Sequence, residues 1–156
     1  MTYIIIVTGP RDWKDKETIY RVLDEELIEF LDPGRGTAWC ADDFSPSGRA
    51  EFTLRHGVAP GADSIANDWG KERGVTIERF HADWRLPEGG VDYSAGPRRN
   101  EKMAAALPRA NKCVAFWDGT VTIRRGRPVS GTRDMIMTAL QHFIPVRVEP
   151  PKGQEK

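Results

Sequence analysis

The sequence predicts an α/β domain in which a parallel sheet of about five strands has helices on both faces. Residues 3–9 are apolar and β-branched without alternation, which is typical of a strand covered on both faces. Strand-like runs then alternate with helical patterns along the chain, and this alternation is typical of a parallel sheet. A single domain is expected, because 156 residues are enough to bury one substantial core.

Composition and charge are those of an ordinary globular protein, with 39% hydrophobic and 29% charged residues. Lys plus Arg and Asp plus Glu both number 23, so no overall charge favours nucleic acid or a membrane surface. Residues 1–4 lack the features of a signal peptide, and no run approaches the roughly 18 apolar residues of a spanning helix. We therefore expect a cytoplasmic protein without a membrane partner, and nucleic acid is a disfavoured partner.

The first half of the chain contains two predicted helices and three predicted strands. The first helix is expected over residues 16–31, with Asp15 as its cap and apolar residues at three- and four-residue steps. Residues 35–50 have no period and are interpreted as a loop insertion, with a lid or a partner contact as the alternative. The remaining elements are strands at 51–57 and 75–80 and a helix at 62–73.

The second half contains two further strands and two further helices. After a long loop over 81–95, a helix is predicted from 96–97, and Pro97 suits its first turn. Strands are predicted at 112–117 and 144–148. Between them lie a polar, basic loop and a helix that opens at residues 130–132. The domain is expected over 1–149, followed by a disordered tail at 150–156.

The most apolar strand belongs at the centre of such a sheet, which favours the strand order 3-2-1-4-5 when the crossovers are right-handed. The order then reverses between the first and fourth strands, and ligands of such sheets bind there, beyond the carboxyl ends. The loops after Thr8, Gly57 and Trp117 and the segment around Ser130 converge at that edge. We therefore expect the functional site in this crevice.

Several segments at that edge carry groups suited to an anion. A glycine-rich turn over residues 57–61 leads into a helix at Ala62 and Asp63, and a helix N-terminus presents free N–H groups to anions such as phosphate. Residues 130–132 form a second Ser/Gly/Thr helix opening. Arg11 and Arg99 add positive charge. From spacing alone, an anion site and ordinary helix connections are about equally favoured.

Each of these features has a purely structural alternative. Asp63 can be a helix N-terminal acid favoured by the dipole, and Thr132 can be a cap. One of Arg98 and Arg99 is expected to point away from any site. His56, at a strand end, is more typical of a packed or hydrogen-bonded residue than of a general base.

Six ordered motifs resemble a known family. They are Thr8–Trp13, His56–Asp63, Ala82–Trp84, Ala95–Asn100 with Met103, Ala115–Gly119 and Ser130–Ile136. Together they are similar to the YspA-like branch of the SLOG superfamily, the Rossmann-like group that contains the LOG phosphoribohydrolases and the DNA-processing protein DprA. The resemblance implies a Rossmann-like domain that binds a nucleotide or a nucleotide-derived small molecule, as a sensor or otherwise. It also implies a homo-oligomer, and we expect no cofactor and no metal.

The LOG enzymes cleave the N-glycosidic bond of nucleoside monophosphates with an Arg before a helix and a Glu in a Pro-Gly-Gly-x-Gly-Thr-x-x-Glu motif. The segment 99–103 is similar to their Arg-Lys-x-x-Met, and Gly131-Thr132 matches their Gly-Thr. Met135 stands where that pattern has Glu, and Asp134 would point about 100° around the helix. The catalytic candidates are therefore limited to Arg99 and Asp134, and the LOG reaction lacks its carboxylate.

The leading hypothesis is nucleotide binding; the alternatives are a phosphoribohydrolase-like enzyme and a DprA-like nucleic-acid module. Whether the protein is an enzyme stays open. Trp84 and Trp117 are candidates to stack on a base, with a core position as the structural alternative. The candidate ligand-binding residues are Thr8, Gly9, Arg11, Gly57, Gly61, Ala62, Asp63, Arg99, Asn100, Asp118, Ser130, Gly131 and Thr132.

Overall fold

The computed structural model describes residues 2–31 and 51–153. The predicted insertion at 35–50 and residues 154–156 of the expected tail lie outside this part of the chain. In chain order the elements are β1 (Thr2–Thr8), α1 (Lys16–Leu31), β2 (Glu51–His56), α2 (Ala62–Arg73), β3 (Thr76–Arg79), α3 (Ala95–Ala105), β4 (Lys112–Phe116), β5 (Thr122–Arg124), β6 (Arg127–Val129), α4 (Gly131–Gln141) and β7 (Val146–Glu149).

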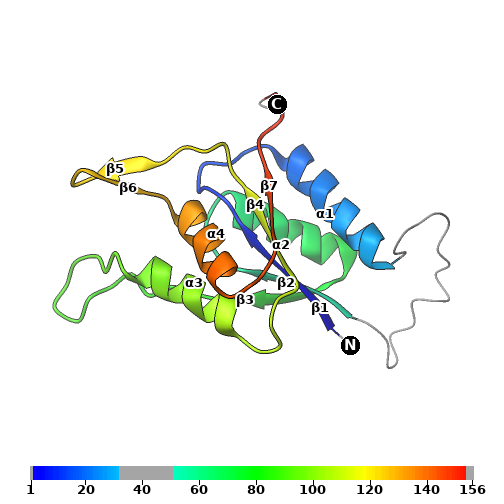
Figure 1. Cartoon of the computed structure of the whole chain (residues 1–156), viewed down its shortest axis with the longest axis horizontal. Helices are drawn as coiled ribbons and strands as arrows, with labels where there is room; N and C mark the ends of the chain where they lie inside the picture. Colours follow the sequence, from blue (N-terminus) through cyan, green and yellow to red (C-terminus); the bar gives the residue numbers. More distant parts are fainter. Residues whose placement is uncertain (1, 32–50, 154–156) are drawn as a thin grey trace.

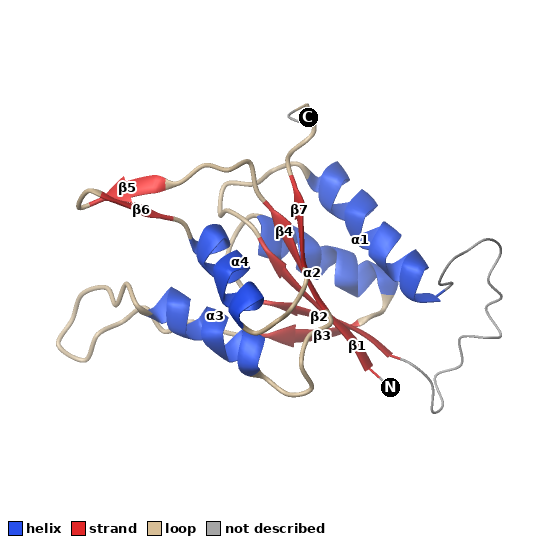
Figure 2. Cartoon of the chain, in the orientation of Figure 1, coloured by secondary structure: helices blue, strands red, loops and turns tan. Residues whose placement is uncertain are grey.

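The main sheet has five strands in the order β3-β2-β1-β4-β7, and all four pairings are parallel (Figures 1 and 2). The predicted order is therefore confirmed, with β7 as the fifth strand of the sheet. This order also places the point at which the strand order reverses between β1 and β4. Because the strands are parallel, all of their carboxyl ends reach one edge of the sheet.

Two hydrophobic cores lie on opposite faces of this sheet, because successive side chains of a strand point to opposite faces. Ile5 and Val7 pack with α1 and α2, in a cluster that includes Trp69. Ile4 and Ile6 pack with α3 and α4 in the second cluster. The prediction of helices on both faces is confirmed, and the continuous apolar run of β1 is explained by burial on both sides.

A β-hairpin replaces the polar, basic loop that was predicted before the last helix. β5 and β6 pair antiparallel, and two residues, Arg125 at φ 53° and Gly126 at φ 77°, connect them. Positive φ at both positions is the geometry of a type I′ turn, which matches the twist of paired strands. The hairpin projects beyond the sheet on the same side as the loop before α3 (Figure 1). The Arg124 guanidinium lies 4.5 Å from the Tyr93 ring centroid.

The helix and chain ends agree with the predictions except at two points. Asp15 caps α1, since its carboxylate accepts from the Thr18 N–H at 3.1 Å. Helix α3 begins at Ala95, just before the predicted start at 96–97. The chain stays against the domain after Pro150, where a disordered tail was expected, because the Lys152 N–H donates to Asp15 at 2.7 Å.

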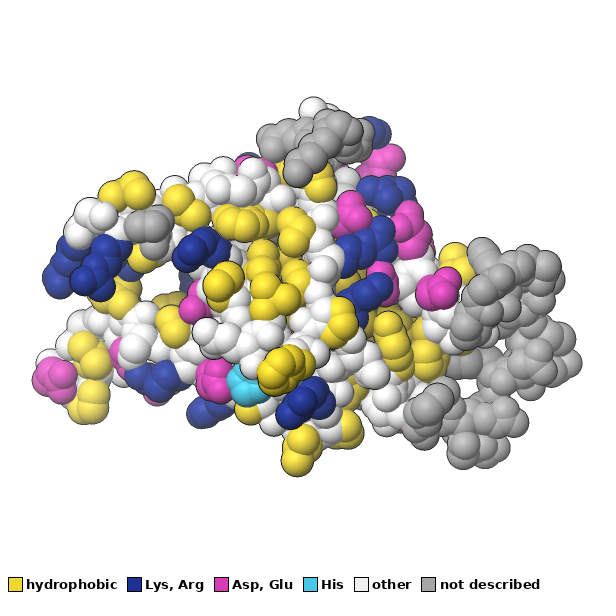
Figure 3. All heavy atoms as spheres, in the orientation of Figure 1, with side chains coloured by type: hydrophobic (Ala, Val, Ile, Leu, Met, Phe, Trp, Pro, Cys, Tyr) yellow, Lys and Arg dark blue, Asp and Glu magenta, His cyan; other side chains and the backbone are white. Residues whose placement is uncertain are grey.

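One face of the molecule carries hydrophobic side chains gathered over α4 and β7 (Figure 3). Met137 and Leu140 of α4 and Val148 of β7 are exposed. In residues 2–31 and 51–153, no helix combines the length and the hydropathy that a membrane crossing requires. The same residues contain no group of three His, Cys, Asp or Glu side chains placed to bind a metal.

Candidate functional site

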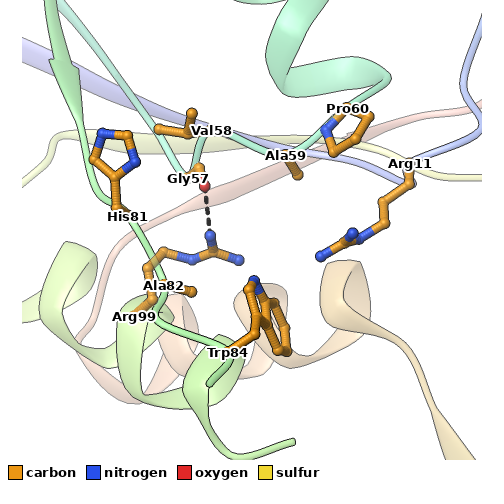
Figure 4. A pocket seen from close by; sticks show the side chains of 9 residues that line it. All are labelled: Arg11, Gly57, Val58, Ala59, Pro60, His81, Ala82, Trp84 and Arg99. Carbon is orange, nitrogen blue, oxygen red and sulfur yellow. Dashed lines mark hydrogen bonds between the residues drawn. The ribbon is translucent and has the colours of Figure 1, made fainter. Parts of the chain in front are cut away.

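A pocket of about 210 Å³ opens at the carboxyl edge of the sheet. Three segments that are far apart in the sequence form its walls: the loop after β1, the turn after β2, and the loop after β3 together with the start of α3. The residues that line it are Arg11, Gly57, Val58, Ala59, Pro60, His81, Ala82, Trp84 and Arg99 (Figure 4). Arg11, Gly57, Trp84 and Arg99 were predicted site residues, and the fold brings them together.

Arg99 reaches the pocket from the second turn of α3. Its Nη1 donates to the Gly57 carbonyl oxygen at 2.5 Å, and its Nε donates to the Asn100 side chain at 3.0 Å. A Cβ at position 57 would lie 2.5 Å from Nη1, so only glycine leaves room for this guanidinium. Burial lowers the pKa of Arg99 from its ordinary value. Arginine nevertheless stays protonated in proteins, so the pocket holds a half-buried cation.

Arg11 enters the pocket from the opposite side, after β1. Its guanidinium carbon lies 5.3 Å from the centroid of the Trp84 ring. The indole is held in turn by Gly96, where a Cβ would come within 2.9 Å of it. In Figure 4 the Arg11 and Arg99 guanidinium groups point toward one another across the indole. Two cations that converge on one cavity favour an anion between them.

The turn between β2 and α2 is anchored from beneath by Asp63. The N–H groups of Gly57 and Ala59 donate to its Oδ2 at 3.1 and 3.2 Å. Asp63 is 5% exposed, and its Oδ1 is buried without a hydrogen-bond partner among the described residues. It does not line the pocket but holds in place the backbone that does. Burial raises the pKa of Asp63 to about 6, despite those two N–H donors and the charges of Arg99 and Arg11.

The raised pKa of Asp63 predicts a gain in stability for Asp63→Asn above about pH 6. The Asp63 carboxyl group binds its proton more tightly in the folded chain than in the unfolded chain, in which its pKa is near 3.8. The contribution of Asp63 to stability is therefore present below about pH 4 and is lost as the pH rises through about 6. Asparagine keeps the acceptor and removes the charge. We expect the unfolding free energy of the variant to exceed that of wild type by about 1–3 kcal/mol at about pH 8, and by little at about pH 4.

Urea unfolding at both pH values measures this difference. Asp68→Asn is the matched control, because Asp68 lies exposed on the same helix. A stability gain of equal size at the two pH values, or a loss at about pH 8, would show that Asp63 does not carry a destabilising buried charge.

His56 supports the same turn as a neutral side chain. Its Nδ1 accepts from the Val58 N–H at 3.0 Å, so its Nε2 carries the proton and donates to Asn67 Oδ1 at 2.9 Å. Burial lowers the pKa of His56. Val58 adopts φ 60°, which is unusual for a β-branched residue. His56 is therefore a packed and hydrogen-bonded residue, which was the structural alternative to a general base.

The first N–H group of α2 is hydrogen-bonded within the chain. The Ala62 N–H donates to the Pro10 carbonyl oxygen at 3.3 Å. A Cβ on Gly9 would lie 2.4 Å from the Ala62 Cβ, and one on Gly61 would lie 2.4 Å from the Pro10 carbonyl oxygen. The prediction that Ala62 offers a free N–H is thus corrected. Gly9, Gly61 and Ala62 let the loop that carries Arg11 pack directly on α2.

The second helix opening, at residues 130–132, does not line the pocket. Ser130 caps α4, since its hydroxyl accepts from the Arg133 N–H at 3.1 Å. Buried Asn100 donates to the Asp134 carboxylate at 2.8 Å and faces the Gly131 carbonyl at 3.5 Å, which joins α3 to α4. Thr132 is buried. These contacts connect α3 to α4. The segment that was predicted as a second phosphate-binding site therefore caps α4 and contacts α3 in the structure.

Three further candidates also lie outside the pocket lining. The Asp118 carboxylate accepts from the Thr120 N–H at 2.8 Å, and the Trp117 indole donates to the Thr120 carbonyl at 2.9 Å. Thr8 is buried at the end of β1. Met135, in the position of the LOG glutamate, is fully buried in the core. Of the two predicted stacking residues, the pocket contains Trp84 and not Trp117.

Sequence reasoning missed His81 and Ala82 in the pocket lining, and it missed Arg55, which contacts the end of α3. His81 lies two residues after the end of β3, and this position beyond the carboxyl end of a parallel strand was an available signal. Arg55 is 1% exposed and donates to the carbonyl groups of Met103 at 3.0 Å and Pro108 at 3.1 Å and to Glu78 Oε1 at 2.7 Å. It therefore fixes the end of α3, the helix that carries Arg99.

Comparison with known proteins identifies the family of this chain. The family model described as YspA, cpYpsA-related SLOG family matches residues 45–86, which include β2, α2, β3 and Trp84. The Gene 61 protein of Mycobacterium phage D29 is 33% identical over 147 residues, which cover 91% of this chain and 92% of that protein. The chain belongs to this SLOG family.

The fold of this SLOG protein is also similar to a solved structure. The X-ray structure of TM1055, a structural genomics target, matches 92% of this chain and 72% of that chain with a TM-score of 0.50 at 17% identity. At this identity the match supports the Rossmann-like fold alone. Membership of the SLOG family supports a nucleotide-related ligand-binding or LOG-like role in general terms.

Proposed function

We propose that this SLOG protein binds a nucleotide or a nucleotide-derived small molecule through a phosphate group held between Arg11 and Arg99. The observation that carries the proposal is the convergence of these two guanidinium groups on one pocket (Figure 4). A guanidinium donates several N–H groups in a planar fork that matches phosphate oxygens. The Gly57 carbonyl accepts from Nη1 of Arg99 and the Asn100 side chain accepts from its Nε, so Nη2 is the nitrogen proposed to donate to the ligand.

The remainder of the ligand is proposed to lie along residues 81–85. The first pocket, at about 210 Å³, is smaller than the roughly 300 Å³ at which small-molecule sites begin, so it suits a phosphate and part of a sugar. A second, more open hollow of about 470 Å³ shares His81, Ala82 and Trp84 with it. The Trp84 indole forms part of both walls and supplies an aromatic surface for a base.

Binding is favoured over cleavage of an N-glycosidic bond. No carboxylate is among the described residues that line the first pocket, and Asp83, which lines the second hollow, is exposed and pairs with Arg85. Asp134, a catalytic candidate from the sequence, is engaged by Asn100. Glycosidic hydrolysis ordinarily needs a carboxylate to stabilise the oxocarbenium-like centre or to activate water. The phosphoribohydrolase reaction therefore stays the alternative, and the zero net charge disfavours the DprA-like nucleic-acid module.

Titration calorimetry with AMP, cyclic AMP and ADP-ribose tests the proposal. We expect at least one of them to bind at millimolar concentration or below. Arg99→Ala is expected to weaken that binding by about 10- to 100-fold, since a hydrogen bond to a charged group contributes about 1.5–3 kcal/mol. Arg98→Ala is the matched control, because the adjacent Arg98 pairs with Asp92 and Ser94 at the surface.

Two results would contradict the proposal. One is the absence of binding by all three ligands at millimolar concentration. The other is equal weakening by the Arg98 and Arg99 variants, which would place the anion elsewhere. Release of free base from these ligands, abolished by Arg99→Ala, would instead support the enzymatic alternative.

Self-association and a cytoplasmic location stay proposals as well. The family resemblance implies a homo-oligomer. The exposed hydrophobic side chains over α4 and over β7, which is an edge strand of the sheet, offer a surface for a second copy (Figure 3).

A further inference from the structure

Asp63 lies directly beneath the backbone that lines the anion pocket. Its Oδ2 accepts from the N–H groups of Gly57 and Ala59, and Arg99 donates to the Gly57 carbonyl. One residue of the pocket wall, Gly57, thus contacts both the buried carboxylate and the pocket guanidinium. Asp63 Oδ1 is buried and lacks a hydrogen-bond partner among the described residues, so it can carry a proton without breaking any contact.

The charges that compensate Asp63 are the same charges that are proposed to hold the ligand. Arg99 and Arg11 both lower the pKa of Asp63, and burial raises it to about 6. An anion between the two guanidinium groups offsets their charge and adds a negative charge nearby. The ionised form of Asp63 then loses much of its compensation in a site where water screens little.

We propose that an anion that binds between Arg11 and Arg99 drives the uptake of one proton by Asp63, so that the pocket binds its ligand more tightly as the solution becomes more acidic. This inference rests on the proposed function, because it concerns the same pocket. The proton comes from the buffer and forms an O–H bond at the Asp63 carboxyl group, and no other bond changes. The pocket would thereby bind anions in a pH-dependent manner.

Cys113, His56 and His81 are the other titratable side chains of this region. Burial raises the pKa of Cys113 to about 12, so its thiol is already protonated at neutral pH. Burial lowers the pKa of His56, and its Nδ1 is occupied by the Val58 N–H. His81 lines the pocket and is exposed, so it is the competing acceptor that an experiment must separate.

Inorganic sulfate is the probe of choice, because it stays a dianion over the whole pH range and so contributes no proton change of its own. Calorimetric titration of wild type at about pH 7, in two buffers of different ionisation enthalpy, measures the protons taken up. We expect an uptake between about half and one proton, and an affinity that weakens by up to about tenfold per pH unit above about pH 6. His81→Gln is expected to keep both effects.

Asp63→Asn is expected to abolish the uptake and to bind sulfate with a flat pH dependence. At about pH 8 it should bind at least as tightly as wild type, because the opposing charge is gone. If Asp63→Asn does not fold, the number of protons that wild type and His81→Gln take up on sulfate binding still tests the inference.

Sulfate binding without proton uptake would overturn this inference and leave the anion site intact. Proton uptake that disappears in His81→Gln would also overturn it, since the proton would then belong to His81. If neither sulfate nor any of the three nucleotide ligands binds, the proposed function fails, and the proton linkage fails with it.

Discussion

Replacement of Arg55 by Met is expected to lower the free energy of unfolding by about 2–4 kcal/mol. Arg55 is fully buried and donates to Glu78 and to the carbonyl groups of Met103 and Pro108. Methionine fills a similar volume but donates nothing. The substitution therefore leaves the buried Met103 carbonyl, the Pro108 carbonyl and the partly exposed Glu78 carboxylate without their donor. The loss of a donor to a buried acceptor costs more than the hydrogen bond itself contributes.

The same replacement at an arginine that pairs on the surface is the control for this loss. Arg73→Met removes an arginine that pairs with Asp24 at 2.8 Å, but both side chains of that pair are about one-third exposed. We expect a loss of about 1 kcal/mol or less there. Urea denaturation of both variants measures the contrast. Comparable losses in the two would mean that Arg55 acts as an ordinary surface arginine and that the end of α3 is held by other contacts.

Gly61→Ala is the second substitution with a large expected effect, a loss of about 3–5 kcal/mol of stability. Gly61 precedes α2 with φ 81° and ψ −123°, a region that is open essentially to glycine alone. A Cβ there would lie 2.4 Å from the Pro10 carbonyl oxygen and 2.5 Å from that of Arg11. Because these are backbone atoms, the loop that carries Arg11 must move. We therefore expect weaker sulfate binding together with the loss of stability.

Gly74→Ala is the matched control for backbone strain without a clash. Gly74 ends the same helix with φ 71°, and a Cβ there would meet nothing within 4 Å. Its expected cost is about 1–2 kcal/mol, the ordinary cost of a left-handed residue with a side chain, and sulfate binding should be unchanged. Thermal unfolding and sulfate titration of both variants test the pair. Weakened sulfate binding by Gly74→Ala, or unchanged binding by Gly61→Ala, would contradict the role given to the contact between Gly61 and the Arg11 loop.

The fold could be predicted because each of its determinants is local in the sequence. The run Ile4–Val7 has no polar interruption, which places β1 in the centre of the sheet. Asp15 and Gly74 mark helix ends through their own backbone and side-chain chemistry. The β5–β6 hairpin was missed, because its strands are only three residues each and its turn uses Arg125 where Asn or Asp is the usual signal.

The pocket could be predicted only in part. Arg11, Gly57, Trp84 and Arg99 follow strand ends or begin a helix, and parallel topology takes such positions to one edge of the sheet. The sequence predicted that both helix openings offer groups to an anion, but the structure shows contacts within the chain at each of them. Ser130 caps its own helix, and the Ala62 N–H is taken by Pro10. The Ser130 cap is a local contact, whereas the Ala62 contact depends on which backbone lies against the opening, and this is decided by packing.

By itself, the sequence determined the α/β class, the strand order and the edge of the sheet at which the pocket opens, since hydrophobic period and chain connectivity are sufficient for these. Only the tertiary structure decided that Arg11 and Arg99 converge on Trp84, that Arg55 fixes the end of α3, and that Asp63 is buried beneath the pocket with one oxygen unpaired. The physical reason is that the pKa of Asp63 and the free donors of a guanidinium depend on desolvation and on partners that are distant in the sequence, and these exist only once the chain has folded.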